Sequence, residues 1–374
     1  MSQASSVCKV LLVAPLPPPR GGIATWTEQM MCEADEYSDI HLDVVDIAPR
    51  WRAVHRTEVW LRVIGGGIQL LRDLLQVLFA ILRSRPDVVH LCTSADLGLV
   101  RDVLILQIAR WFRVRSIYHL HFGRLPDLTQ SGGWECIFIY HAIGLAGTVI
   151  VLDTRSFETI RQKCPGQAVQ KLPNCANPAR LEHDHIVPAV PSLSTTLPRV
   201  LFVGWVVAAK GVLDLIAASL QVHTDTPFEL EIVGPGDPGF VAAIKQTGAP
   251  LGNALHVRGE LPHAEALGAM LEADILVLPS HSEGFPIVVI EAMSLGKPVL
   301  GTDVGAIREI LEGDDDPCGV VVPAKDIDAL AKALRRLIRD PDVRRVLGQN
   351  AQRRFALQYD CDQVFRSLRQ VWLS

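Results

Sequence analysis

The chain has 374 residues, a length that suits two domains of roughly 150–200 residues each better than one. Hydrophobic residues make up 49% of it and charged residues 21%, which predicts a packed globular protein and excludes a disordered one. The net charge of −5 gives no general electrostatic reason to expect nucleic-acid binding.

The N-terminal half alternates short β-branched runs with amphipathic segments. Strands are predicted over 9–15, 42–47, 87–91, 114–121, 147–152 and 168–174. Helices are predicted near 23–36, 60–84, 97–111, 133–145 and 154–163. Alternation of this kind indicates parallel strands with helices on both faces of the sheet, a doubly wound arrangement.

A break and a restart follow. Residues 177–199 are rich in Pro, Ser and Thr and have no sustained period, which marks a domain boundary. Strands are then predicted over 199–205, 228–236, 254–260, 273–280, 297–303 and 318–324. Helices are predicted over 325–338, 341–357 and 360–372. We therefore expect an α/β protein with two tandem Rossmann-like domains, whose ligands bind in the loops after strands.

The eight cysteines are scattered, with no C-x-x-C pair and no Cys/His cluster at zinc spacing. We expect them to be reduced, which favours a cytoplasmic protein. The N-terminus lacks the charged-then-apolar layout of a signal peptide and is typical of a first buried strand.

Gly21 and Gly22 join the first strand to the first helix. They permit close backbone approach, and the helix after them offers free N–H groups to an anion or a hydroxyl. An ordinary βα turn is an equal alternative. The spacing is not G-x-G-x-x-G, so a dinucleotide site is not indicated.

His119 and His121 alternate onto one face at the end of the strand predicted over 114–121. Either ring can direct a hydrogen-bonding nitrogen into a ligand cleft. A core histidine is the alternative for one of the two. Metal binding by the pair needs further ligands, and the sequence offers no obvious ones.

Lys210 and Gly211 follow a strand and the turn at Gly204, and they are predicted to open the next helix. A lysine there opposes the helix dipole unless it neutralises an anion such as a diphosphate, so its position favours a function. Gly234 follows another strand and suits a backbone wall against a base or a ribose. By itself that glycine is a weak signal.

Glu283 and Glu291 lie on either side of a Gly-Phe-Pro turn. Pro286 fits the first position of a helix, which puts Glu283 just before the helix and Glu291 inside it. Glu291 interrupts a nearly continuous apolar run, so it needs a partner or an opening to solvent. Ribose hydroxyls, an arginine or a backbone group would each serve.

Two other charged features have simpler explanations. The acidic runs at 314–316 and 326–328 suit a loop and a helix start better than a metal site. The apolar segment 60–85 carries Arg62, Arg72, Arg83 and Arg85, with Arg50, Arg52 and Arg56 before it. It could lie on an anionic membrane surface, and a buried crossover helix is the alternative.

Together these stretches resemble the retaining nucleotide-sugar glycosyltransferases of family four, which have the GT-B fold. The resemblance covers nearly the whole chain and is strongest over 199–323. Its most specific element is "EGFPIVVIE" (283–291), the E-x7-E signature of that family. Residues 292–310, 318–323 and the hinge-preceding "LPNCAN" (172–177) extend it.

The resemblance implies a role for each matching residue. His121, with His119 as the other candidate, would contact the transferred sugar. Lys210 would hold the diphosphate, and Glu283 would meet sugar hydroxyls near the reacting carbon. Glu291 would bind the ribose. The other residues implied in donor binding are Gly21, Gly22, Gly204, Gly234, Phe285, Pro286 and Ile287.

The chain also departs from the family pattern. Trp205 stands where the family usually has an arginine, which leaves Lys210, the helix dipole and Arg124 or Arg20 to neutralise phosphate. In the hinge element Cys175 replaces a glycine and Asn177 an acid, and Ala306 replaces the second glycine of a Gly-Gly pair. The change at 205 bears on catalysis more than on the fold.

The resemblance implies an acceptor-binding domain over 1–180, a nucleotide-sugar-binding domain over 199–358 and a helix over 359–374 that packs on the first domain. We expect a glycosyltransferase that moves a sugar to a hydroxyl acceptor with retention, in polysaccharide or glycolipid assembly, without a metal. Its partners would be the sugar donor, a sugar or lipid-linked acceptor and the inner face of a membrane, with no nucleic acid. The alternatives are a sugar-nucleotide epimerase or hydrolase, and a non-catalytic binding subunit.

Overall fold

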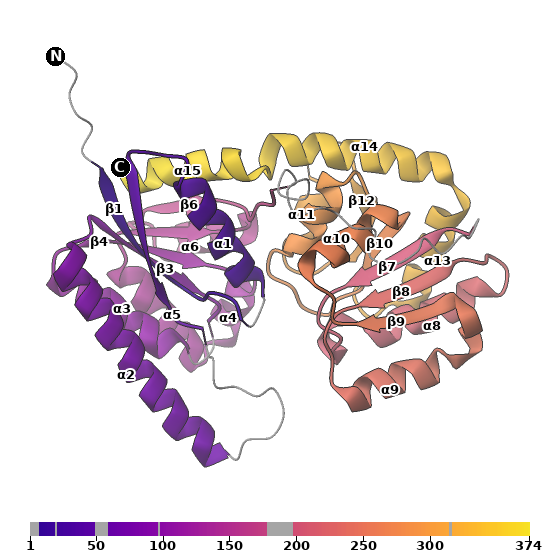
Figure 1. The fold of residues 1–374 in the computed structure, drawn as a ribbon, viewed down its shortest axis with the longest axis horizontal. Coiled ribbons are helices and arrows are strands. Elements are labelled where there is room, and N and C mark those ends of the chain that lie inside the picture. Colours follow the sequence, from indigo (N-terminus) through magenta and orange to yellow (C-terminus); the bar gives the residue numbers. More distant parts are fainter. Residues whose placement is uncertain (1–6, 19–20, 49–58, 96–97, 178–196, 314–315) are drawn as a thin grey trace. The chain divides into compact units, whose positions relative to one another are not determined.

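A computed structural model describes residues 7–18, 21–48, 59–95, 98–177, 197–313 and 316–374, with only the backbone over 59–64. The chain divides into two compact units (Figure 1). Unit 1 comprises Met1–Asn174 and Cys361–Ser374, and unit 2 comprises Cys175–Asp360.

Unit 1 is built on a six-stranded sheet with the order β2-β1-β3-β4-β5-β6, and every pair is parallel. The strands are β1 (Cys8–Ala14), β2 (Ile40–Asp46), β3 (Val88–Thr93), β4 (Arg115–Leu120), β5 (Thr148–Val151) and β6 (Val169–Lys171). All six predicted strands are confirmed. β3 is buried along its whole length, as expected of a parallel strand covered on both faces.

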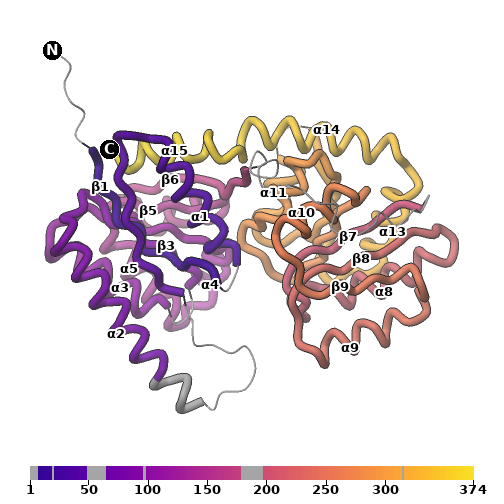
Figure 2. The backbone as a smooth tube through the Cα atoms, in the orientation of Figure 1, coloured from indigo at the N-terminus to yellow at the C-terminus, as the bar shows by residue number. Residues whose placement is uncertain are grey.

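The unit 1 helices confirm the predicted alternation and add one more. They are α1 (Gly22–Ala34), α2 (Val59–Ser84), α3 (Gly98–Trp111), α4 (Leu125–Ser131), α5 (Trp134–Leu145), α6 (Thr154–Lys163) and α15 (Cys361–Leu373). The short α4 was not predicted. At the other end of the chain, α15 packs beside α1, as the tube trace shows (Figure 2).

Unit 2 repeats the plan with the parallel order β12-β11-β10-β7-β8-β9. Its strands are β7 (Arg199–Val203), β8 (Glu229–Val233), β9 (Leu255–Gly259), β10 (Ile275–Leu278), β11 (Val299–Thr302) and β12 (Gly319–Val322). The six strands predicted for this half are also confirmed. The fold is thus α/β with two Rossmann-like units, as expected.

The unit 2 helices begin differently from the prediction at two places. They are η1 (Ala208–Lys210), α8 (Val212–His223), α9 (Pro238–Thr247), η2 (Ala249–Ala254), α10 (His263–Glu272), α11 (Ile287–Ser294), α12 (Ile307–Leu311), α13 (Ile327–Arg339) and α14 (Pro341–Gln358). Lys210 ends the 3₁₀ turn η1 instead of opening α8. Pro286, with an extended ψ of 114°, precedes α11 instead of being its first residue.

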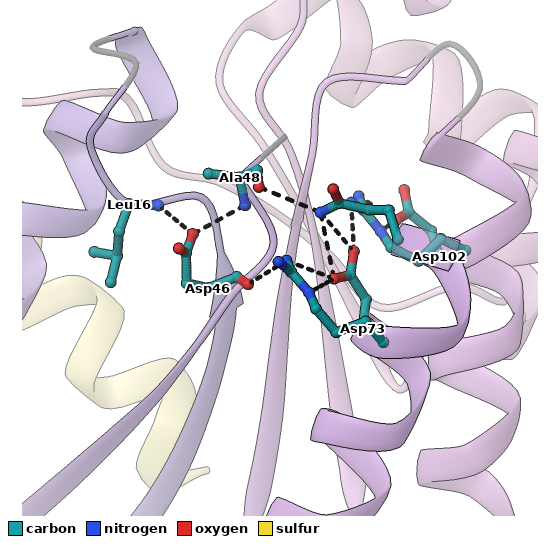
Figure 3. A network of polar contacts seen from close by, with 8 residues as sticks. Leu16, Asp46, Ala48, Asp73 and Asp102 are labelled. Atoms are coloured by element: carbon teal, nitrogen blue, oxygen red, sulfur yellow. Dashed lines mark hydrogen bonds and ion pairs between the residues drawn. The ribbon is translucent and has the colours of Figure 1, made fainter. Parts of the chain in front are cut away.

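A polar network fastens α2 to the ends of β1 and β2 in unit 1 (Figure 3). The carboxylate of Asp46 accepts hydrogen bonds of 2.9 Å from the backbone N–H groups of Leu16 and Ala48. Gln69 of α2 donates to the Ala48 carbonyl at 3.2 Å, and Arg72 to the Asp46 carbonyl at 3.4 Å. The face that α2 turns to the sheet is therefore partly polar.

The same network continues into α3. Asp73 of α2 has a fully buried side chain and lies 3.0 Å from Arg72 and 3.8 Å from Arg101 of α3. Arg101 also pairs with the buried Asp102 at 3.0 Å, to which the Tyr118 hydroxyl donates at 3.2 Å. Both buried carboxyl groups are therefore paired with arginine side chains.

Candidate functional site

Lys210 and Glu283 meet at the carboxyl edge of the unit 2 sheet. Lys210 lies in η1 after β7, Glu283 lies in the loop after β10, and Lys210 Nζ is 2.6 Å from Glu283 Oε1. The Ser280 hydroxyl donates to the same oxygen at 2.6 Å. The Glu283 side chain is only 7% exposed. Two residues that the sequence predicted for one site therefore form a largely covered ion pair.

Backbone contacts hold the two loops of this pair together. The His281 N–H donates to the Ala209 carbonyl at 2.9 Å. Gly211, at φ +64°, lies so near the other loop that an added Cβ would be 1.9 Å from the Pro279 oxygen. Only glycine suits that conformation and that approach. The glycine after Lys210 thus sets the position of the lysine.

His281 and Asp214 form a second ionisable pair beside the first. His281 Nε2 lies 2.7 Å from Asp214 Oδ2, in the first turn of α8, and both side chains are about a quarter exposed. The pair ties the loop after β10 to the start of α8. The sequence did not predict it, because the two residues are far apart in the chain.

Glu291 has a side-chain partner inside unit 2. Its Oε1 lies 2.8 Å from Nε2 of His263, the first residue of α10. The Glu291 side chain is 12% exposed and the His263 side chain 42%. The prediction that Glu291 needs a partner is confirmed, and the partner is a histidine. Because His263 is the more exposed member, a hydroxyl-bearing ligand can approach this pair.

Gly204 and Gly234 lie at the ends of neighbouring strands, and their backbone donors are already used. The Gly204 N–H donates to the Val233 carbonyl at 3.0 Å, and the Gly234 N–H to the Gly259 carbonyl at 2.8 Å. Next to Gly204, Trp205 is 38% exposed. This edge of the sheet therefore presents an indole ring at position 205 and not a guanidinium group.

The Phe-Pro-Ile step before and into α11 is used in packing. Phe285 is 6% exposed and its ring lies 5.9 Å from that of Tyr359. Pro286 is buried, and Ile287 is 8% exposed. These three residues anchor the helix start and the preceding loop that carries Glu283.

Ala306, which stands where the family has a second glycine, has a φ of −89° that any residue adopts. Gly305 before it has a φ of +56°, and an added Cβ would lie 2.5 Å from the carbonyl oxygens of Glu283 and Gly284. The Ala306 N–H donates to the Gly284 oxygen at 2.9 Å. Gly305 therefore supports the Glu283 loop, and alanine at 306 fits the backbone conformation there without strain.

In unit 1, the glycine pair lies at the start of α1. Gly21 is extended, Gly22 is the first helical residue, and both are exposed. Arg124, one of the expected phosphate-neutralising cations, lies 3.7 Å from Glu135. Arg20 and the arginines at 50, 52 and 56 lie outside the described residues, as do the side chain of Arg62, the acidic positions 314 and 315, and 178–196 of the boundary segment.

His119 and His121 join a histidine and tryptophan cluster in unit 1. Their rings lie 3.9 Å apart between centroids. His90 of β3 places Nε2 3.2 Å from His119 Nδ1. Trp26 of α1 packs edge-on against all three rings, at 4.8–5.8 Å. The prediction that the two histidines share a face is confirmed, and His90 and Trp26 were not predicted.

Burial keeps these histidines neutral. It lowers the pKa of His90 and of His121 to about 3, and lowers the pKa of His119 well below its usual value. Proximity to another ring of the cluster adds to this shift for His119 and His121. The cluster therefore offers neutral hydrogen-bonding groups.

Unit 1 also contains a grouping with the composition of a metal site. The ligand atoms of His90, Cys92 and His119 all lie within 4.8 Å of one another, and all three residues are buried. The spacing of these residues in the sequence does not reveal the group, because two neighbouring strands bring it together.

Comparisons with known proteins indicate the family. Over residues 188–354 the chain matches the sequence model of a family described as Glycosyl transferases group 1. It is 28% identical over 221 residues to the α-D-kanosaminyltransferase of Streptomyces kanamyceticus, covering 56% of each chain. It is 30% identical over 301 residues to the glycogen synthase of Mycobacterium tuberculosis, covering 78% of this chain and 69% of the synthase.

Solved structures agree on the fold. Sucrose-phosphate synthase from Thermosynechococcus elongatus superimposes with a TM-score of 0.71 at 19% identity, covering 98% of both chains. Anabaena HepE (Alr3699), solved in complex with UDP, gives a TM-score of 0.68 at 17% identity, covering 97% of this chain and 99% of HepE. The two-unit GT-B architecture expected from the sequence is therefore confirmed.

Proposed function

Because the chain belongs to the group 1 family of glycosyltransferases, we propose that it transfers a sugar from a nucleoside-diphosphate sugar to a hydroxyl acceptor with retention of configuration. The product would enter polysaccharide or glycolipid assembly. The observation that carries this proposal is the Lys210–Glu283 pair at the carboxyl edge of the unit 2 sheet. It lies within residues 188–354, which match the family.

The pair supplies two chemically different groups at one place. A diphosphate leaving group gathers negative charge as its bond to the sugar breaks, and the Lys210 ammonium would stabilise that charge. An incoming diphosphate would draw Lys210 away from Glu283, whose carboxylate would then accept hydrogen bonds from sugar hydroxyls. Ser280 keeps Glu283 in place meanwhile, because it donates to Oε1 independently of the lysine.

The reaction we propose balances without a metal. The acceptor oxygen forms a bond to the anomeric carbon while the bond from that carbon to the diphosphate oxygen breaks. The diphosphate departs with the electron pair, and one of its oxygens takes the acceptor proton. Attack and departure occur on the same face of the sugar, which retains the configuration. Glu291 and His263 would bind the ribose hydroxyls of the donor.

Two rival functions make different demands. An epimerase or hydrolase needs acid and base groups that act on the sugar or on a water. His90, His119 and His121 of unit 1 support these rivals poorly, since burial holds them neutral. A non-catalytic binding subunit is favoured by Trp205, which removes one expected cation from the phosphate site.

A donor screen tests the binding part of the proposal. We expect one class among UDP-, GDP-, ADP- and dTDP-sugars to raise the melting temperature of the purified chain, because a ligand that binds only the folded state stabilises it by mass action. The rise should be absent in Lys210→Ala and present in Lys245→Ala, which removes an exposed lysine elsewhere in unit 2. No rise with any of the four classes would contradict donor binding.

We further propose that the acceptor is presented at a membrane surface, on the cytoplasmic side, where free cysteines such as all eight in this chain remain reduced. The outward face of α2 supports this. It exposes an apolar stripe with 55–66% of each side chain open to solvent, comprising Ile68, Leu71, Leu75, Phe79 and Leu82. The segment Gly65–Ser84 is long and apolar enough to cross a membrane by length and composition, but α2 packs against α3 and the sheet.

Cations around the stripe favour an anionic lipid surface over a second copy of this chain, because a symmetric dimer through this face would bring the same cations together. α2 and α3 both return antiparallel to the same parallel strands, so their C-terminal ends are neighbours. Those ends carry exposed cations and aromatic rings, namely Arg83, Arg85, Arg110, Trp111, Phe112 and Arg113. The acids of the two helices, Asp73 and Asp102, are buried and paired.

Vesicle flotation tests the membrane proposal. The chain should float with vesicles of phosphatidylcholine and phosphatidylglycerol in low salt, and less with phosphatidylcholine alone. Leu75→Glu with Phe79→Glu should abolish flotation, whereas Leu357→Glu, at an equally exposed leucine of α14, should not. Flotation that the double variant leaves unchanged, or a concentration-dependent dimer with no flotation, would overturn it.

A further inference from the structure

The histidine cluster of unit 1 is joined by a residue of α15. Trp372 of α15, itself fully buried, donates its indole N–H to His90 Nδ1 at 3.0 Å. His90 Nε2 faces His119 Nδ1 at 3.2 Å. Two hydrogen bonds thus connect four ring nitrogens from Trp372 of α15 through His90 of β3 to His119 of β4. We call this arrangement the relay.

The Trp372 indole N–H fixes the direction of both hydrogen bonds in the relay. An indole nitrogen only donates, so His90 Nδ1 carries no proton. Neutral His90 must then carry its proton on Nε2, and it donates to His119 Nδ1. Neutral His119 in turn must carry its proton on Nε2. The lowered pKa values of both rings support the neutral state that this reasoning needs.

The same direction disfavours a metal at His90, Cys92 and His119. A histidine that binds a metal through Nε2 normally donates its Nδ1–H to an acceptor, and here His90 Nδ1 faces another donor. Burial raises the pKa of the Cys92 thiol well above its usual value, whereas a metal needs the thiolate. His90, Cys92 and His119 are residue types that bind metals. The protons on the two histidine rings, however, are placed as the relay requires and not as a metal site requires.

We propose that Trp372 is a positioning residue, which acts through His90 to hold His119 as a fixed Nε2–H donor for a neutral oxygen acceptor. The His119 Nε2 atom is buried and has no hydrogen-bond partner among the described residues, and the same holds for the neighbouring Trp26 indole N–H. Buried donors are rarely left unpaired, so two donors on rings whose centroids lie 5.1 Å apart point to an oxygen acceptor. A hydroxyl group or a water has the chemistry required.

This inference extends the proposed function, because a directed donor at the end of β4 can orient a substrate hydroxyl. It also links the folding of the C-terminal helix to that donor, since Trp372 belongs to α15. A mere packing role for Trp372 would not depend on its nitrogen.

Nitrogen NMR of the full chain with ¹⁵N-labelled histidine tests the relay without relying on activity. From pH 6 to 8 we expect His90 and His119 to be neutral Nε2–H tautomers. Trp372→Phe, which keeps an aromatic ring but removes the donor, should convert both residues to tautomer mixtures. An Nδ1–H tautomer at His119 in the unaltered chain would overturn the proposal.

A matched pair of substitutions at His90 separates the relay from packing. Glutamine can accept from Trp372 with its oxygen and donate to His119 with its nitrogen, so His90→Gln should keep the His119 tautomer. His90→Leu should lose it. If both variants are folded and give the same His119 spectrum, the relay is refuted.

Zinc and turnover complete the test. Equimolar zinc should leave the His90 and His119 signals unchanged, and a shift that EDTA reverses would establish the metal site instead. If the chain proves to be a transferase, His90→Leu should lower kcat about tenfold or more relative to His90→Gln, since orienting hydrogen bonds matter most in the transition state. Absence of any transferase activity would count against the proposed function, and the NMR result would still decide the relay.

Discussion

The two units treat their ionisable side chains in opposite ways. Unit 2 joins them in side-chain pairs at the edge of its sheet, the ion pair of Lys210 with Glu283 and the contact of His281 with Asp214. Unit 1 packs three histidines together, with His90 and His119 buried and His121 half-buried, and keeps them neutral. Charged pairs that are partly open can exchange partners with a ligand, whereas a buried neutral chain fixes the direction of each proton. Unit 2 is therefore suited to exchanging charged partners, and unit 1 to orienting hydrogen-bond donors.

The largest effect we expect is at the charged pair of unit 2. Lys210→Ala should lower kcat about 10²–10³-fold, because it removes a cation that stabilises the departing diphosphate. Steady-state release of nucleoside diphosphate measures the loss. Lys245→Ala should leave kcat unchanged. A loss in kcat of less than tenfold in Lys210→Ala would show that catalysis does not depend on the charge of Lys210.

The second expected effect belongs to unit 1 and concerns acid. The folded pKa values of His90 and His121 are about 3, below the value of about 6.5 in an unfolded chain. The unfolded state therefore binds more protons than the folded state. The contribution of these histidines to the free energy of unfolding is fully present above about pH 6.5 and is lost as the pH falls towards 3. Each histidine should contribute up to about 1.4 kcal/mol per pH unit in that window.

Denaturant titrations at pH 7, 6 and 5 measure this loss, before most carboxylates begin to titrate. His90→Gln, which removes one titrating ring and keeps its hydrogen-bonding pattern, should flatten the dependence of stability on pH by about a third for three histidines. An equal slope in the variant and the unaltered chain would show that the cluster does not remain neutral on folding.

The smallest expected effect is at the proposed phosphate site, where Trp205 stands. Trp205→Arg should tighten nucleoside-diphosphate binding about fivefold, since a half-exposed ion pair contributes about 1 kcal/mol. Calorimetry with the nucleotide identified in the donor screen measures it. Val207→Arg places the same charge at a comparably exposed position two residues away and should have less effect. Equal tightening in both variants would indicate a general charge effect.

The strands and the unit 2 site could be predicted because their determinants are local. Parallel strands buried on both faces leave continuous β-branched runs, and all twelve were found. Glu283 and Lys210 stand beside glycines and helix starts that have their own sequence signals. The helix α4 escaped prediction because its seven residues are too few to show a period.

The histidine cluster could not be predicted in the same way. It joins Trp26, His90, His119, His121 and Trp372, which come from four separate segments and have no common spacing in the sequence. Only the sheet order and the return of α15 to unit 1 bring them together. His263, the partner of Glu291, was missed for the same reason. The sequence indicated that Glu291 needs a partner, but tertiary contacts determine which residue that partner is.

The most direct test of the transfer mechanism compares two products in one reaction. With the matching donor and a hydroxyl acceptor, the chain should release nucleoside diphosphate and glycosylated acceptor in equal amounts, with retained configuration, and should release almost none without acceptor. Equal release with and without acceptor would identify a hydrolase. Tight donor binding with no release across a broad acceptor panel would contradict catalysis and leave unit 2 as a binding module.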